Sequence, residues 1–158
     1  MRVRRPPAGG FAAPGLQAHP ICDNAPMPED HFGEPVAERY DESAADMFDP
    51  AIVDPAVDFL AALAGRGAAL ELGIGTGRIA IPTAAAGLRV IGIDSSPGML
   101  EVCQERAELA GVADRLDLRL GELEVPPVEE RVALVTCPFR SYLHLLDDES
   151  RLRSLRAV

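Results

Sequence analysis

The chain contains one stretch in which three structural signals follow one another, Ala68-Ala69-Leu70-Glu71-Leu72-Gly73-Ile74-Gly75-Thr76-Gly77-Arg78-Ile79-Ala80. It begins as an apolar strand, continues into a turn with three alternating glycines and ends at the start of a helix. Glycines let the backbone turn tightly and approach a ligand without a Cβ between them, and the helix start offers unpaired N–H groups. The pattern predicts a nucleotide-cofactor site, with a tight structural turn as the alternative.

The next predicted strand supports the nucleotide site. Residues 88–93 are apolar and partly β-branched, and they end in Asp94, 17 residues after Gly77. A carboxylate at the end of the second strand of such a unit accepts hydrogen bonds from two ribose hydroxyls. Two linked features therefore indicate a ligand that contains a ribose.

The glycine spacing separates two cofactor classes. The dinucleotide fingerprint has glycine at its first, third and sixth positions, because the last glycine allows the helix to pack closely beside a pyrophosphate. Counted from Gly73, the sixth position is Arg78. A nicotinamide-dependent oxidoreductase is therefore disfavoured and is retained only as a third hypothesis.

With an acidic residue, a leucine and three alternating glycines, residues 71–78 resemble the first motif of the class I S-adenosylmethionine-dependent methyltransferases, and residues 90–100 resemble the motif that follows it. The resemblance covers roughly residues 27–158 and is closest to the group that acts on small molecules. It implies a Rossmann-like, doubly wound α/β sheet. Relatives have seven strands in the order 3-2-1-4-5-7-6, whereas this chain stops in the helix after the fourth. We therefore expect a C-terminally truncated domain with strand order 3-2-1-4.

The resemblance also implies which residues hold S-adenosylmethionine. The three glycines give backbone approach, Glu71 anchors the amino group, and Asp94, followed by Ser95, holds the ribose. Further expected contacts lie around the methionine half, the methyl group and the adenine: Tyr40, Arg78, Met99, Glu122, Leu123, Cys137 and Phe139.

Several of these assignments have structural alternatives. Tyr40 could pack on a helix surface, Arg78 could pair with acidic residues of the N-terminal arm, and Met99 could fill the core. Glu122 stands where many relatives have aspartate, which puts its adenine contact in doubt. His144 is a candidate general base near neutral pH, but a lone histidine between leucines is more often structural.

Composition limits the partners. The chain has 158 residues, 47% of them hydrophobic, a net charge of −10 and no lysine among its 15 basic residues. Such a charge repels phosphate backbones and anionic lipid, and residues 137–139 lack the amide and second proline of the turn found in nucleic-acid aminomethylases. Three cysteines without paired or metal-ligand spacing suit a reducing cytoplasm, and we expect no metal site. A nucleic-acid substrate and a membrane partner are not expected.

Local patterns predict the elements. Residues 1–35 are rich in Pro, Gly and Ala and are expected to form a disordered arm before a methyltransferase part over residues 36–158. We expect strands over residues 68–72, 88–93, 115–120 and 131–136, and helices over residues 52–64, 77–86, 97–110 and from 147. Pro82 predicts a kink, and an open edge at the fourth strand predicts self-association.

The predicted activity is methyl transfer from S-adenosylmethionine to an O, N or C nucleophile of a small molecule. The sulfonium methyl is already activated, so that catalysis consists mainly of proximity, orientation and exclusion of water. The alternative is a non-catalytic cofactor-binding fragment or pseudoenzyme. The methyl acceptor itself cannot be inferred, because substrate contacts in similar enzymes come largely from variable terminal segments.

Overall fold

The computed structural model describes residues 45–158, so the predicted arm over residues 1–35 and Tyr40 lie outside the described residues. Four parallel strands form one sheet in the order β3-β2-β1-β4. This arrangement confirms the predicted Rossmann-like α/β class and the strand order 3-2-1-4. The strands are β1 (Ala69–Leu72), β2 (Val90–Asp94), β3 (Leu116–Leu120) and β4 (Leu134–Thr136).

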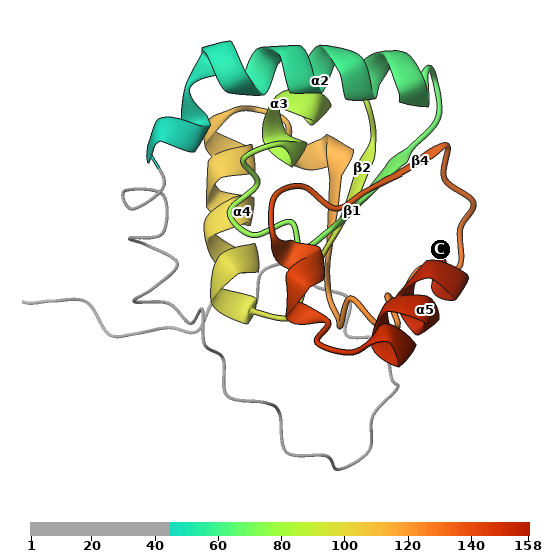
Figure 1. The fold of residues 1–158 in the computed structure, drawn as a ribbon. Coiled ribbons are helices and arrows are strands. Elements are labelled where there is room, and N and C mark those ends of the chain that lie inside the picture. Colours follow the sequence, from blue (N-terminus) through green and yellow to red (C-terminus); the bar gives the residue numbers. More distant parts are fainter. Residues whose placement is uncertain (1–44) are drawn as a thin grey trace, which may run out of the picture.

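Helices connect and cover these strands. Figure 1 shows α2 lying over α3, α4 running beside the sheet, and α5 at the end of the molecule away from α2. The longer helices are α2 (Pro50–Ala64), α3 (Ala80–Ala85), α4 (Pro97–Leu109) and α5 (Asp148–Ala157). Short 3-10 helices are η1 (Ala45–Phe48), η2 (Ala113–Arg115) and η3 (Ser141–His144). Among the described residues no helix combines the length and apolar character needed to cross a bilayer.

The two central strands carry core residues on both faces of the sheet. Leu70 and Leu72 pair in register with Ile91 and Ile93, and these four form one buried cluster. The opposite face packs against α3 and α4 through a second cluster that contains Val90, Leu100, Cys103, Ala107 and Leu118. Burial on both faces explains why these strands are apolar apart from Glu71 and the terminal Asp94.

Residues at the ends of α2 and α4 match the capping signals in the sequence. The Asp49 side chain accepts a hydrogen bond from the Ala51 N–H, and Gly65 ends α2 with a positive φ of 60°. Ser96 accepts from the Met99 N–H at 3.2 Å at the start of α4. These contacts satisfy backbone groups that have no partner within the helix. Both helices form where they were predicted.

Three local predictions need correction. The helix predicted from Gly77 starts at Ala80, so Pro82 falls in its first turn, where a missing N–H breaks no intrahelical bond and no kink is needed. The helix predicted over residues 97–110 ends at Leu109, and Ala110 is its exposed C-cap. The fourth strand was predicted from residue 131 but begins at Leu134, which pairs with Ala69 at the start of β1; before it only the Ala133 N–H donates to the Ala68 carbonyl, at 2.8 Å.

The polar face predicted for β3 carries an ion-pair cluster. Arg119 donates to Asp117 at 2.7 Å, to Glu130 and to the Pro127 carbonyl at 2.8 Å. Its side chain is only 14% exposed. These charge-assisted contacts lower the pKa of Glu130 to about 2 and fasten the loop after β3 to the sheet.

Candidate functional site

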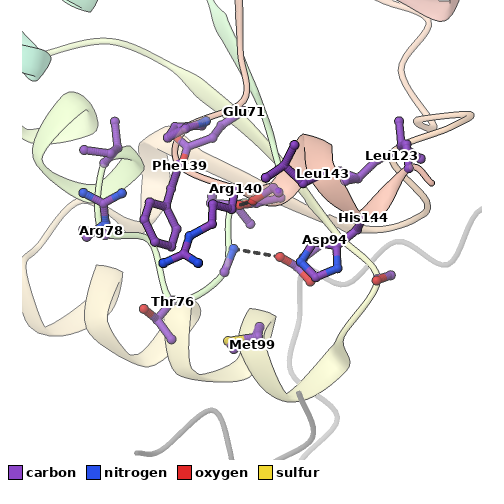
Figure 2. Close-up of a pocket in the computed structure, with 18 of the residues that line it drawn as sticks. Glu71, Thr76, Arg78, Asp94, Met99, Leu123, Phe139, Arg140, Leu143 and His144 are labelled. Carbon is purple, nitrogen blue, oxygen red and sulfur yellow. Dashed lines mark hydrogen bonds between the residues drawn. The ribbon is translucent and has the colours of Figure 1, made fainter. Parts of the chain in front are cut away.

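A cavity of about 580 Å³ opens at the carboxyl ends of the strands. Its walls come from the glycine turn after β1, the end of β2, the start of α4 and the loops after β3 and β4 (Figure 2). This is where open parallel sheets bind small ligands. The residues predicted as site residues that line it are Glu71, Gly73, Gly75, Arg78, Asp94, Ser95, Met99, Glu122, Leu123, Phe139 and His144.

The glycine turn is held against β2 by its own backbone. The N–H groups of Gly73 and Ile74 donate to the Ile93 carbonyl at 2.8 and 2.9 Å. All three glycines of the turn have positive φ, with values of 69°, 55° and 86° for Gly73, Gly75 and Gly77. Residues with a Cβ rarely adopt this conformation, which explains the alternating glycines.

The three glycines nevertheless face different surroundings. A Cβ on Gly73 would lie 2.4 Å from the Ser141 Cβ, and one on Gly77 would lie 2.7 Å from the Cys103 Sγ. A Cβ on Gly75 would meet no atom within 4 Å, because this residue faces the open cavity. Gly77 does not line the cavity and serves helix packing instead. Gly75 is therefore the glycine whose backbone a ligand can approach without obstruction.

Asp94 connects the end of β2 to the glycine turn. One carboxylate oxygen accepts from the Gly75 N–H at 2.8 Å, drawn as a dashed line in Figure 2, and the other accepts from the Ser96 N–H at 3.0 Å. The Asp94 side chain also lines the cavity. This geometry fixes the position of the carboxylate in the absence of a ligand.

Glu71 is a buried acid in the cavity wall. Its exposed fraction is 4%, and no described residue donates a hydrogen bond to its carboxylate. Burial raises its pKa from 4.5 to about 8, against the smaller, lowering effect of Arg78. The pKa rises because burial removes water from the charged form of Glu71 and no close partner compensates for it. A cationic ligand group beside Glu71 would relieve this cost.

The loop after β4 places an aromatic ring at the mouth of the cavity. Phe139 is 51% exposed and has φ of 62°, the one positive φ of a non-glycine residue among residues 45–158. Its ring lies between the guanidinium groups of Arg78 and Arg140, with centroid distances of 5.9 and 4.6 Å (Figure 2). Backbone strain of this kind costs about 1–3 kcal/mol and tends to occur at functional sites. Cys137, in contrast, lines a neighbouring cavity.

The remaining predicted site residues lie at different places on the cavity wall. Met99 is 4% exposed and also lines the cavity, so core packing and ligand contact are compatible there. Glu122 and Leu123 follow β3 and reach the same wall. His144 lines the cavity from η3. Within the described part of the chain no group of three His, Cys, Asp or Glu side chains is arranged to hold a metal ion.

Sequence reasoning missed several cavity residues. Ile74, Thr76 and Ile79 lie in or directly after the glycine turn and are buried, and the others come from the loop after β4. The Ser141 Oγ lies 3.4 Å from the Gly73 carbonyl oxygen, although the two residues are 68 positions apart. Only the return of this loop onto the glycine turn brings them together, and no local pattern signals it. The missed residues of this loop are Pro138, Arg140, Ser141, Leu143 and Leu145.

The comparisons with known proteins agree with this geometry. A family described as a methyltransferase domain matches residues 69–158. The CcbJ methyltransferase from Streptomyces caelestis is 33% identical, with a TM-score of 0.73, over 82% of this chain and 52% of that protein. The chain therefore belongs to the class I S-adenosylmethionine-dependent methyltransferases, whose methyl donor is S-adenosylmethionine.

Further similar structures extend the comparison. The glycopeptide N-methyltransferase MtfA in complex with S-adenosylmethionine is 25% identical, with a TM-score of 0.59, over 66% of this chain and 43% of that one. CalS10, an amino pentose methyltransferase from Micromonospora echinaspora, shares the fold. It is 21% identical, with a TM-score of 0.58, over 73% of this chain and 49% of that one. The chain thus spans about half the length of these proteins. A search of curated proteins found no match.

Proposed function

We propose that the chain binds S-adenosylmethionine in the cavity at the strand ends and takes part in methyl transfer to an O, N or C nucleophile of a small molecule. The observation that carries the proposal is the cavity itself. In it, the Gly75 backbone is open to a ligand, while the carboxylates of Glu71 and Asp94 line the walls.

The donor groups of the cavity fit this cofactor. Glu71 is buried without a hydrogen-bond donor among the described residues, and its raised pKa shows that a positive charge beside it would be favourable. The ammonium group of the methionyl part meets this need. Asp94, held by the Gly75 and Ser96 N–H groups, is a carboxylate acceptor on the cavity wall of the kind that accepts from ribose hydroxyls. Met99 supplies an apolar surface for the adenine.

The bound cofactor supplies a methyl group that its sulfonium already activates. The residues of this chain then have to position the acceptor and exclude water. Phe139 and Pro138, at the mouth of the cavity, are suited to both tasks. His144 lines the same cavity and is the candidate base for acceptors that must lose a proton.

Nitrogen is the first acceptor atom to test, because MtfA is a glycopeptide N-methyltransferase. A nucleic-acid acceptor is disfavoured by the net charge of −10. A chain that binds the cofactor without transferring the methyl group remains the alternative function. Turnover rather than binding separates these two.

The test is a calorimetric titration of the chain with S-adenosylhomocysteine, with NADH in parallel. We expect micromolar binding of S-adenosylhomocysteine and none of NADH. Transfer of a tritiated methyl group to a panel of amines and phenols then distinguishes an enzyme from a cofactor-binding chain. NADH binding, or no binding of S-adenosylhomocysteine, would contradict the proposal.

A further inference from the structure

A second cavity, of about 380 Å³, adjoins the first. The two share Arg78, Ile79, Pro138 and Phe139 as lining residues, so Phe139 stands at their junction. The second cavity therefore begins where the proposed methyl donor site ends. A molecule in it could present an atom to the mouth of the first cavity.

The two cavities differ in chemistry. The acidic side chains of Glu71, Asp94 and Glu122 line the first. The second is lined by apolar side chains of α2, among them Ala56 and Phe59, and its single charged lining residue among those described is Arg78. An apolar wall with a cation and no carboxylate favours an apolar ligand that carries a negative charge.

The junction holds a second cation. Arg78, Phe139 and Arg140 form a stack, which we call the Arg-Phe-Arg stack, with the ring between the two guanidinium groups (Figure 2). Arg78 also donates to the Met47 carbonyl at 3.3 Å. Within residues 45–158 neither arginine forms an ion pair with a carboxylate, whereas Arg89, Arg119, Arg151 and Arg153 all do.

The stack restricts where these charges lie. A guanidinium over an aromatic ring keeps its in-plane N–H groups available for an anion, and Arg presents them in a planar fork that matches a carboxylate. Arg66, Arg115, Arg131 and Arg156 also form no ion pair with a described carboxylate. What distinguishes Arg78 and Arg140 is that both stack on one ring at the cavity mouth. An acceptor's anionic group would complete their interactions.

We infer that the second cavity is the methyl-acceptor site and that it selects a small apolar or aromatic molecule carrying a carboxylate or similar anion. The apolar body lies against α2, and the anionic group lies at the Arg-Phe-Arg stack. The inference rests on the proposed function, because it takes the first cavity as the methyl donor site. It names the class of acceptor, which that proposal leaves open.

The test uses two probes of nearly equal size and shape, the anion 6-hydroxy-2-naphthoate and the neutral 6-hydroxy-2-naphthamide. Binding is measured by probe fluorescence with S-adenosylhomocysteine at saturation. We expect the naphthoate to bind at least tenfold more tightly than the naphthamide. In Arg140→Gln the difference should fall below threefold, while Arg156→Gln, which removes an exposed arginine of α5, should leave it unchanged. Equal affinity of both probes for the unaltered chain would overturn the inference.

A second pair of variants tests the location. Ala56→Phe fills the second cavity, whereas Ala62→Phe adds the same side chain at an exposed position of the same helix that does not line it. We expect Ala56→Phe to abolish naphthoate binding and Ala62→Phe to retain it. Naphthoate binding that survives Ala56→Phe would overturn the inference. Both variants are first titrated with S-adenosylhomocysteine, so that failure of the donor site itself is recognised separately.

Discussion

The backbone N–H of Gly75 donates a hydrogen bond to Oδ2 of Asp94 at 2.8 Å. This contact joins the middle of the glycine turn to the last residue of β2. The same carboxylate accepts from the Ser96 N–H, at the start of α4. One side chain therefore holds three parts of the cavity wall in place before any ligand arrives.

Replacement of Asp94 tests this arrangement. Asp94→Ala removes both hydrogen bonds to a charged acceptor, and we expect a loss of about 1.5–3 kcal/mol in the free energy of unfolding. Affinity for S-adenosylhomocysteine should fall more than tenfold, because the ribose partner is also lost. Urea denaturation and calorimetric titration measure the two effects. Asp114→Asn, at an exposed position of η2, is the control and should change neither.

The glycines of the turn should separate binding from stability. Gly75→Ala introduces a Cβ into open space at φ of 55° and should cost about 1–2 kcal/mol of stability through backbone strain alone. Its Cβ occupies the cavity wall, so the affinity for S-adenosylhomocysteine should fall strongly. The two quantities are measured by urea denaturation and titration.

Gly77→Ala should lower stability more than Gly75→Ala does, and it should leave the affinity for S-adenosylhomocysteine unchanged. Its Cβ would lie 2.7 Å from both the buried Cys103 Sγ and the Ile81 Cδ1, so overpacking of about 1–3 kcal/mol adds to the backbone strain. Gly77 does not line the cavity, and the folded fraction should retain its affinity. If Gly75→Ala proved the more destabilising variant, the assignment of the two glycines would be wrong.

Glu71 should make stability depend on pH. Its pKa is about 8 in the folded chain and 4.5 when unperturbed, so in this window the folded chain binds more protons than the unfolded one. Stability should therefore fall as pH rises from about 5 to 8, by up to about 1.4 kcal/mol per pH unit from this group. Urea denaturation across this range should show the fall in the unaltered chain relative to Glu71→Gln. A difference that stays constant with pH would contradict the account.

The same acid should release a proton when the cofactor site is filled. At pH 7 Glu71 is mostly protonated in the folded chain, and an adjacent ammonium group would lower its pKa. Calorimetric titrations with S-adenosylhomocysteine in buffers of different ionisation enthalpy should report this proton. Glu71→Gln should bind with an enthalpy that does not vary with the buffer.

Arg119 provides a test of a purely structural contact. It pairs with Asp117 and Glu130 on the polar face of β3, and neither it nor these partners line the cavity. Arg119→Gln should lower stability by about 1–3 kcal/mol, because it breaks several charge-assisted hydrogen bonds. Affinity for S-adenosylhomocysteine in the folded fraction should not change.

Much of this architecture follows from local pattern. Largely apolar segments predicted the buried strands β1 and β2, and the structure confirms both as strands of one parallel sheet. The resemblance to the methyltransferases implied that Gly73, Gly75 and Asp94 hold one cofactor. The structure places all three on the cavity wall.

The features that the local sequence pattern did not predict depend on contacts between residues far apart in the sequence. Ser141 reaches Gly73 only because the loop after β4 folds back across the sheet edge. Ala110 has the helical spacing of a buried residue, yet α4 ends just before it. Gly77 faces Cys103, whereas Gly75 faces open space. The glycine spacing in the sequence is the same for both and does not distinguish these surroundings.

The most direct test of the central claim is an NMR titration of the ¹⁵N-labelled chain with S-adenosylhomocysteine, followed through backbone amide resonances. The account predicts large shifts for the amides of Gly73, Gly75 and Ser95, which line the cavity, and little change for Leu152 in α5, which does not. Unchanged glycine-turn amides, or shifts confined to residues away from the cavity, would contradict it.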